Sequence, residues 1–261
     1  MPEMKRVFAI VCAVVVCIVA AARPLAVGHR GSVWGVENTR EAFVNGAKKG
    51  YDYLECDVRV AGDGTYVLSH DETTGRLGGS LTVASSTIGQ LKGETYTQTR
   101  QGVTYTGTMC TVAEYLDICK ECGVQPVIEL KWSTGINSND CSNLPGLMSL
   151  IEDKGFRSTC VILTSMRPCL EYIRSRYPDV RLQFLARKNW AEHFDWCVKN
   201  GIDADIQAGC LDEETVARFH GAGLKVNVWT VNDEESCREY AGYGCDFITT
   251  DYAEVPCLSH K

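Results

Sequence analysis

Eight short apolar stretches, separated by segments with helical periodicity, constrain the fold of this chain more than any other feature. The stretches begin near residues 25, 53, 126, 160, 182, 202, 224 and 246. Helical patterns lie between several of them, at about residues 166–177, 190–200, 212–221 and 233–241. Eight strand–helix units in a chain of this length predict a (β/α)8 TIM barrel of class α/β. A doubly wound open sheet is the alternative, but no Gly-rich dinucleotide-binding loop accompanies it.

A short arm after the second strand interrupts this alternation. An Ala-Gly-Asp-Gly turn at residues 61–64 separates the second strand from another strand-like run at residues 65–69. The connection is too short for a parallel crossover, so we expect the run to return as an antiparallel hairpin. Residues 72–109 are polar and weakly periodic. They predict a small, irregular insertion over the barrel mouth.

The second strand carries two acids, Glu55 and Asp57. Side chains alternate across a strand, so both carboxylates point to one face and Cys56 points to the other. Two carboxylates directed into one site repel each other, and a bound cation or protonation relieves the repulsion. The other interpretation is a solvated strand face, where two acids are harmless.

Two histidines stand at matching positions near this acidic pair. His29 directly follows the apolar run at residues 25–28, and His70 directly follows residues 66–69. The ends of strands are where α/β folds place reactive groups. A single histidine there is more often structural than catalytic, but two at matching positions predict a shared site.

A further charged pair, Glu129 and Lys131, ends the strand at residues 126–131. The strand is apolar before Glu129, so the charges occur only at its C-terminal end. That end is the active-site end of a parallel barrel. A surface salt bridge is the simpler alternative.

The N-terminal segment differs in kind from the rest. Lys5 and Arg6 precede an uncharged run at residues 7–22 that ends in three alanines. This pattern predicts a secretory signal peptide at residues 1–22, followed by one domain at residues 23–261, and hence export to a periplasmic or extracellular location. The run is short for a membrane span of roughly 20 residues. Membrane anchoring by an uncleaved segment and a buried helix at the barrel bottom are the alternatives.

The net charge limits the kinds of binding partner that we expect for this chain. A net charge of −7 argues against nucleic acid or an anionic membrane surface as a partner, so we expect membrane contact only through an uncleaved N-terminal segment.

The 14 cysteines are scattered, and we expect most of them to be small buried hydrophobic residues. The Cys119–Cys122 spacing suits a redox or zinc site, but no partner pair accompanies it. Two disulfides stay open: Cys160 with Cys169, and Cys237 with Cys245.

Taken together, these motifs resemble the glycerophosphodiester phosphodiesterase family across about residues 25–255. The resemblance lies in the order and spacing of the matching segments, which is more specific than any one of them. The segments are His29-Arg30-Gly31, Glu37-Asn38-Thr39, Glu55-Cys56-Asp57-Val58, Asp63-Gly64, His70-Asp71-Glu72, Glu129-Leu130-Lys131, Trp229-Thr230-Val231-Asn232 and Thr249-Thr250-Asp251-Tyr252. Ala253 stands where the family usually has proline, and Cys110 replaces another family proline.

The resemblance implies hydrolysis of a small-molecule glycerophosphodiester to glycerol 3-phosphate and an alcohol. Glu55, Asp57 and Glu129 supply hard oxygen ligands, which suit a divalent metal, Ca²⁺ or Mg²⁺. His29 and His70 form the expected acid/base pair. The remaining expected roles are phosphate binding by Arg30 and Lys131, a pocket wall at Trp229, and support from Glu37 and Asn38.

Two other functions stay open at this level. One is phospholipase D-like cleavage of lysophospholipids or sphingolipids, which related barrels carry out. The other is a non-catalytic barrel that binds phosphodiesters.

Overall fold

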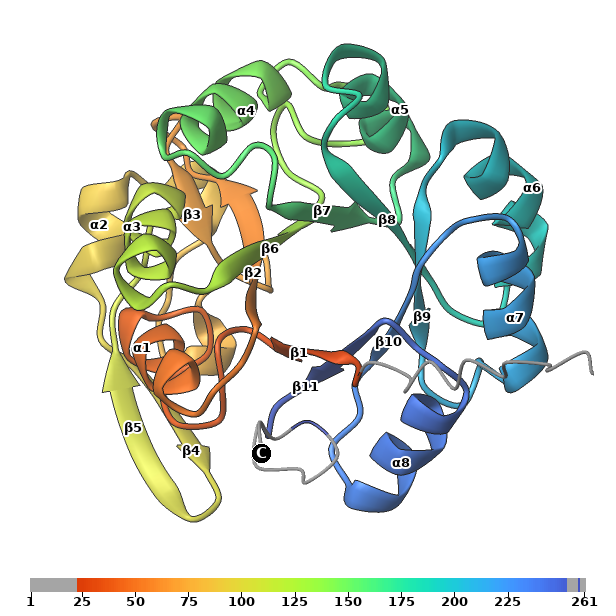
Figure 1. The fold of residues 1–261 in the computed structure, drawn as a ribbon. Helices are drawn as coiled ribbons and strands as arrows, with labels where there is room; N and C mark the ends of the chain where they lie inside the picture. Colours follow the sequence, from red (N-terminus) through yellow and green to blue (C-terminus); the bar gives the residue numbers. More distant parts are fainter. Residues whose placement is uncertain (1–22, 253–257, 259–261) are drawn as a thin grey trace, which may run out of the picture.

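The computed structural model describes residues 23–252 and 258, and within them the predicted (β/α)8 barrel is confirmed. Eight parallel strands follow one another in the order β1-β11-β10-β9-β8-β7-β6-β2, and β1 pairs with β2 to close the ring (Figure 1). The strands are β1 (Leu25–Gly28), β2 (Tyr53–Val60), β6 (Gln125–Leu130), β7 (Val161–Thr164), β8 (Arg181–Ala186), β9 (Asp203–Gln207), β10 (Val226–Trp229) and β11 (Phe247–Thr250).

Helices surround the ring (Figure 1). They are α1 (Arg40–Lys48), α3 (Val112–Cys122), α4 (Leu144–Asp153), α5 (Arg167–Arg176), α6 (Trp190–Asn200), α7 (Glu213–Gly221) and α8 (Glu234–Gly242). Helices α5 to α8 coincide with the four predicted helical patterns. Helix α3 begins with a capping box in which Thr111 accepts from the backbone N–H of Glu114, and the Glu114 side chain accepts in return from Thr111.

The predicted hairpin is confirmed, because β3 (Tyr66–Leu68) pairs antiparallel with β2. The predicted small insertion is also present, but the expectation that it is irregular is wrong. Residues 72–109 contain η1 (Gly75–Leu77), η2 (Val83–Ser85), α2 (Ile88–Gly93) and a second hairpin, β4 (Tyr96–Arg100) with β5 (Val103–Gly107). Threonines face each other across that hairpin, and Gln101 and Gly102 turn the chain with positive φ. A Gln-Gly pair is a weak turn signature, which explains why the hairpin was not expected.

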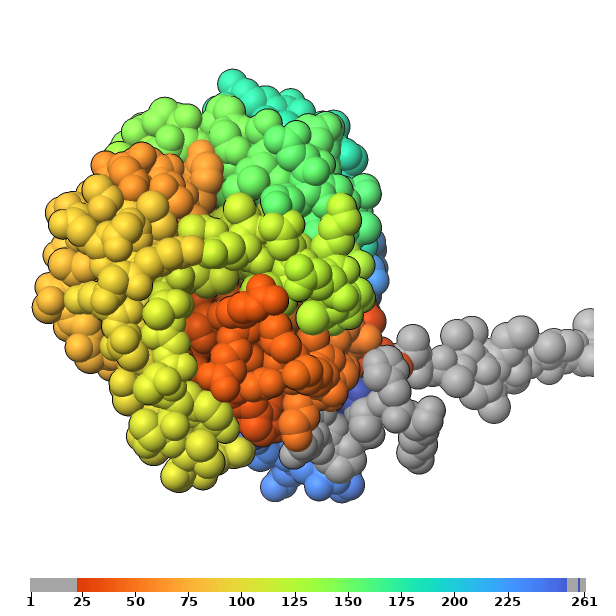
Figure 2. Space-filling model, turned by 90° about the vertical axis from the view of Figure 1, so that its left-hand side faces the viewer, coloured from red at the N-terminus to blue at the C-terminus, as the bar shows by residue number. Residues whose placement is uncertain are grey.

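The insertion has a small hydrophobic core of its own, which includes Val83, Leu91, Tyr96 and Met109. It lies beside α1 and α3, and Figure 2 shows it as the orange-to-yellow surface on that side of the molecule. The insertion is therefore a folded appendage of the barrel.

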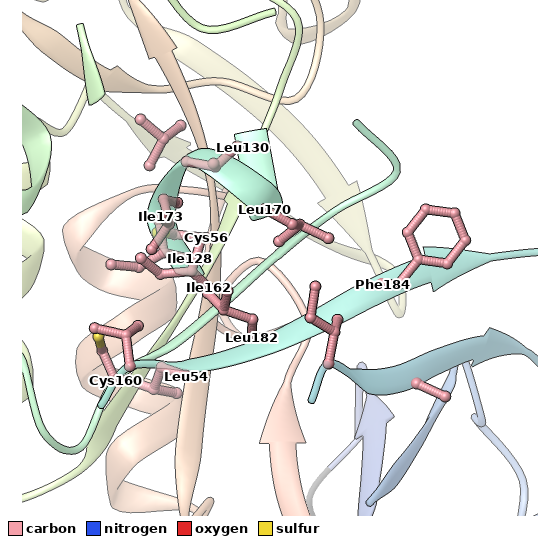
Figure 3. Close-up of a cluster of buried hydrophobic side chains, with 14 of the residues drawn as sticks. Leu54, Cys56, Ile128, Leu130, Cys160, Ile162, Leu170, Ile173, Leu182 and Phe184 are labelled. Atoms are coloured by element: carbon pink, nitrogen blue, oxygen red, sulfur yellow. The ribbon is translucent and has the colours of Figure 1, made fainter. Parts of the chain in front are cut away.

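The main hydrophobic core lies between the barrel and its helices. Outward-facing residues of neighbouring strands, such as Leu54, Ile128 and Ile162, pack with Leu170 and Ile173 of α5 in one buried cluster (Figure 3). Burying one such side chain contributes about 1.5–3 kcal/mol. The cluster fixes the strand positions and hence the side chains on the inner face.

The barrel interior changes character along the strands. One cluster of Val27, Val127, Val161, Leu163 and Phe247 fills it with apolar side chains. The charged inward-facing residues of β2 and β6 come later in their strands. The sequence order of each strand therefore places charged groups at the C-terminal mouth, above an apolar plug.

The cysteines are mostly packing residues, as expected. Cys119 is buried and Cys122 is exposed, and both are free. Neither disulfide left open by the sequence forms, because Cys160, Cys169 and Cys245 are free thiols while Cys237 is bonded in a disulfide.

The expected signal peptide at residues 1–22 lies outside the described residues. Among the described helices, none has the length and apolar character that a transmembrane span requires.

Candidate active site

Three carboxylates from two neighbouring strands converge at the barrel mouth. Glu55 and Asp57 of β2 and Glu129 of β6 each offer one oxygen, and these oxygens lie within 4.8 Å of one another. Strand register explains the convergence, because Asp57 and Glu129 are directly paired positions of the parallel ladder. The expectation that three acids meet is thereby confirmed in geometry.

The loop after β1 closes over this acidic cluster. Arg30 and Gly31 have φ values of 51° and 92°, a left-handed conformation that costs little for glycine and more for arginine. The bend points the Arg30 backbone N–H at Glu55 Oε2, 2.7 Å away, and the Gly31 N–H at the Glu55 carbonyl, 3.1 Å away. These contacts tie the loop to β2.

Asn38 holds Asp57 from the other side. Its Nδ2 donates to Asp57 Oδ2 at 2.7 Å, and its Oδ1 accepts from the Asp57 backbone N–H at 3.1 Å. Asn38 also has a positive φ of 58°, which asparagine tolerates better than most residues. The expected supporting role of Asn38 thus corresponds to a pair of hydrogen bonds.

Lys131 lies between two of the acids. Its Nζ is 3.0 Å from Asp57 Oδ1 and 2.6 Å from Glu129 Oε1. Burial opposes ionisation of Asp57, but the charges of Lys131 and Arg30 outweigh it and lower the pKa of Asp57. Burial and the neighbouring acids raise the pKa of Glu55 and of Glu129. Lys131 and Arg30 therefore relieve only part of the repulsion among the three acids.

Both histidines line the mouth, and each has an aspartate at its Nδ1. His29 Nδ1 is 3.0 Å from Asp251 Oδ1, and His70 Nδ1 is 2.7 Å from Asp71 Oδ1. A carboxylate accepts, so Nδ1 carries the proton in both rings and Nε2 is left for other partners. Burial lowers the pKa of His70, which favours the neutral imidazole.

Glu37 lies behind the site and binds three arginines, which together form an arginine hub. It is 2% exposed and contacts Arg30 at 3.1 Å, Arg76 at 2.8 Å and Arg100 at 3.3 Å. Burial would raise the pKa of Glu37, but the arginines lower it to about 2. Arg76 also binds Asp71, at 2.6 Å.

Arg100 extends this network toward the other histidine. Its Nη1 lies 3.9 Å from Asp251 Oδ1, the partner of His29. Glu37 is therefore linked through arginines to both histidine–aspartate pairs. Arg100 comes from β4, so the unexpected hairpin contributes a side chain to the site.

These groups enclose a pocket of about 300 Å³ at the mouth of the barrel. The predicted residues that line it are His29, Arg30, Glu55, His70, Glu129, Lys131 and Trp229. Asp57 lies just beneath, 1% exposed. The structure thus brings together every predicted catalytic, metal and substrate-binding residue, with Glu37 and Asn38 behind them.

The pocket also contains residues that sequence reasoning missed as site residues, notably Arg187 and Asp205. Asp205 belongs to β9, where alternation along the strand places it on the inward face together with Asp203 and Gln207. A run of polar residues on the inward face of a barrel strand could have identified it. Arg187 directly follows β8 and lies over the Trp229 ring, 5.4 Å from its centroid. Its position after a strand end is the same feature that identified His29 and His70.

Comparisons with known proteins agree with this geometry. A profile of the glycerophosphoryl diester phosphodiesterase family matches residues 25–255. The chain belongs to this family. It is thereby a member of a family of phosphoric diester hydrolases. The sequence-based resemblance is confirmed.

Individual relatives share the whole barrel. The YhdW protein of Bacillus subtilis strain 168 is 26% identical, covering 87% of this chain and 94% of its own. The glycerophosphodiester phosphodiesterase of Caldanaerobacter subterraneus subsp. tengcongensis is 24% identical, covering 89% and 96%. The structure of an Oleispira antarctica phosphodiesterase, solved with the product sn-glycerol-3-phosphate, superposes with a TM-score of 0.75 at 20% identity and covers 88% of this chain and 94% of its own. That likeness shows that the fold is shared.

The acidic cluster of this family member fits a divalent metal. Ca²⁺ takes oxygen ligands at about 2.3–2.6 Å, so oxygens on opposite sides of one ion are about 5 Å apart, close to the observed spread. Glu55 Oε1 is buried and has no hydrogen-bond partner within the described part of the chain. A cation there would relieve the repulsion that raises the pKa of Glu55 and Glu129.

Proposed function

We propose that this chain hydrolyses glycerophosphodiesters to glycerol 3-phosphate and an alcohol, with Ca²⁺ or Mg²⁺ held by Glu55, Asp57 and Glu129. The observation that carries the proposal is the convergence of these three acids with two histidines and two cations in one small pocket. A bound divalent ion would stabilise negative charge on the phosphoryl oxygens.

The remaining groups suit the two proton transfers of hydrolysis. Arg30 and Lys131 bind phosphoryl oxygens, and Lys131 does so as a point charge. One of His29 and His70 removes a proton from the attacking hydroxyl, which belongs to water or to the glycerol moiety. The other gives a proton to the departing alcohol oxygen. Each uses Nε2, because its Nδ1 proton is held by an aspartate.

The test is a matrix of metals and substrates. The purified protein is stripped of metal and incubated with glycerophosphocholine or glycerophosphoethanolamine and with Ca²⁺, Mg²⁺ or no addition. Phosphorus NMR should show glycerol 3-phosphate only where metal is present. Absence of turnover with every metal and every glycerophosphodiester would refute the proposal.

An exposed tryptophan supports lipid cleavage as a second candidate. Trp132, directly after Lys131, is 52% exposed beside a groove of about 550 Å³ that also reaches Glu129. An aromatic side chain at the mouth can contact an acyl chain. Faster turnover of lysophosphatidylcholine than of glycerophosphocholine, with a selective loss in Trp132→Ala, would favour the phospholipase D-like activity.

We also propose that residues 1–22 direct export and are removed, which leaves the catalytic domain at residues 23–261. The disulfide at Cys237 supports this, since disulfides persist in oxidising compartments. Mass spectrometry of the protein recovered from its native cells tests it. An intact N-terminus in the membrane fraction would favour anchoring instead.

A further inference from the structure

Asp205 faces the metal-binding acids from the opposite wall of the pocket. In the closed ring of strands, β9 lies four positions from β2 in either direction, so the two strands are diametrically opposed (Figure 1). Asp205 is 2% exposed and lines the same pocket as Glu55 and Glu129. Its Oδ1 has no hydrogen-bond partner within residues 23–252 and 258. A buried carboxyl oxygen without a partner is costly unless a ligand supplies one.

A second unpartnered group lies on the same wall. The indole Nε1 of Trp229 is buried and donates to no partner among the described residues. Trp229 is on β10, two residues beyond the position paired with Asp205, so both side chains point inward on adjacent strands. The wall therefore offers one hydrogen-bond acceptor and one donor. A hydroxyl group satisfies both, since it donates to a carboxyl oxygen and accepts from an indole N–H.

The surroundings favour a neutral group over a cationic one. The Arg187 guanidinium already lies over the Trp229 ring, 5.4 Å from the centroid. A quaternary ammonium would need that ring face and would be repelled by the arginine. Leu163 and Leu185 complete the wall with apolar surface, which suits the carbon chain of a polyol.

The position of the phosphate-binding groups decides which end of the substrate reaches this wall. Arg30 and Lys131 come from the β1 and β6 side of the barrel, so the enclosed pocket leads from them toward β9. The other organic group has the adjoining groove of about 550 Å³, which begins at Lys131 and Arg187 and runs past Trp132.

Resting on the proposed function, we propose that Asp205 and the Trp229 indole N–H bind the glycerol hydroxyl farthest from phosphorus and thereby select glycerol over other alcohols. Asp205 is then a specificity-determining residue. It acts on substrate binding from the wall opposite the reacting phosphate.

The test removes the hydroxyl and the carboxyl separately. The substrates are glycerophosphocholine and its 2-hydroxypropyl analogue, which lacks only the terminal hydroxyl. Wild type should prefer the glycerol compound by about 10-fold or more in kcat/KM, because a site built for a hydroxyl rejects an analogue without it. Asp205→Val should abolish most of that preference, and Asp205→Asn, which retains an acceptor, should keep part of it. The loss of kcat/KM from removing the substrate hydroxyl and the loss from Asp205→Val should not be additive, because both remove the same contact.

A matched control comes from the same strand. Asp203 also faces inward but accepts from the Lys225 backbone N–H at 2.9 Å and does not line the pocket. Asp203→Asn should leave the substrate preference as in wild type. Thermal unfolding of each variant checks that it is folded.

Product binding separates this inference from the proposed function. Calorimetric titration compares glycerol 3-phosphate with 2-hydroxypropyl phosphate and needs no turnover. Tighter binding of glycerol 3-phosphate to wild type, lost in Asp205→Val, would support the hydroxyl site even if no diester were hydrolysed. Equal binding of the two phosphates to wild type, or equal losses for both substrates in Asp205→Val, would overturn it while hydrolysis itself stood.

Discussion

Substitution of Glu37 by glutamine tests whether the arginine hub stabilises the fold. Glu37 is buried, and its contacts with three arginines lower its pKa from 4.5 to about 2. At 1.36 kcal/mol for each pH unit, this difference corresponds to about 3 kcal/mol of stability at neutral pH. The loss of one partner from a buried ion pair is of similar size, at about 3–5 kcal/mol. Glu37→Gln should therefore be about 3 kcal/mol less stable than wild type at pH 7.

The difference in stability between wild type and Glu37→Gln should depend on pH. The pKa of Glu37 is lower in the folded state, so its stabilisation is complete above pH 4.5 and is lost as the pH falls toward 2. The gap between wild type and variant should shrink by about 1 kcal/mol between pH 6 and about pH 3.5. Urea unfolding followed by tryptophan fluorescence measures it.

A nearby exposed acid provides the control. Glu41 in the first turn of α1 is exposed, so Glu41→Gln should change stability by no more than about 0.5 kcal/mol at either pH. A Glu37→Gln variant that loses less than about 1 kcal/mol, or a gap that does not vary with pH, would refute the reasoning.

Three further predictions concern chemistry and local structure. His29→Ala and His70→Ala should each lower kcat by about 10²-fold or more while leaving Ca²⁺ binding measurable by calorimetry, because general acid–base catalysis contributes on that order; turnover near the wild-type rate in either would exclude that histidine as acid or base. Glu129→Gln should raise the Ca²⁺ or Mg²⁺ concentration for half-maximal activity at least about 10-fold, since it removes one of the three proposed ligands. An unchanged metal requirement would place the ion elsewhere. Thr111→Ala should destabilise the protein by about 1 kcal/mol in urea unfolding, because it removes half of the α3 capping box. An unchanged free energy of unfolding would show that the cap does not contribute to stability.

Local sequence patterns predicted much of the fold. Strand alternation placed Glu55 and Asp57 on one face and Cys56 on the other, and the short Asp-Gly turn required an antiparallel return. These features depend on residues close together in sequence, where backbone geometry leaves few choices. The hairpin at residues 96–107 escaped prediction because its turn lacks a strong signature and its pairing rests on threonine contacts across the strands.

The sequence likewise predicted only part of the candidate site. Motif order was sufficient to name its histidines, acids and cations, because each belongs to a recognisable strand or to the residues that directly follow one. The sequence could not place Asp205 opposite Glu55, nor connect Arg100 to the partner of His29. Closing the barrel decides which strands face each other, and a salt bridge between distant segments depends on that closure. The chain alone thus determined which chemical groups are available, and the tertiary structure decided which of them meet across the pocket.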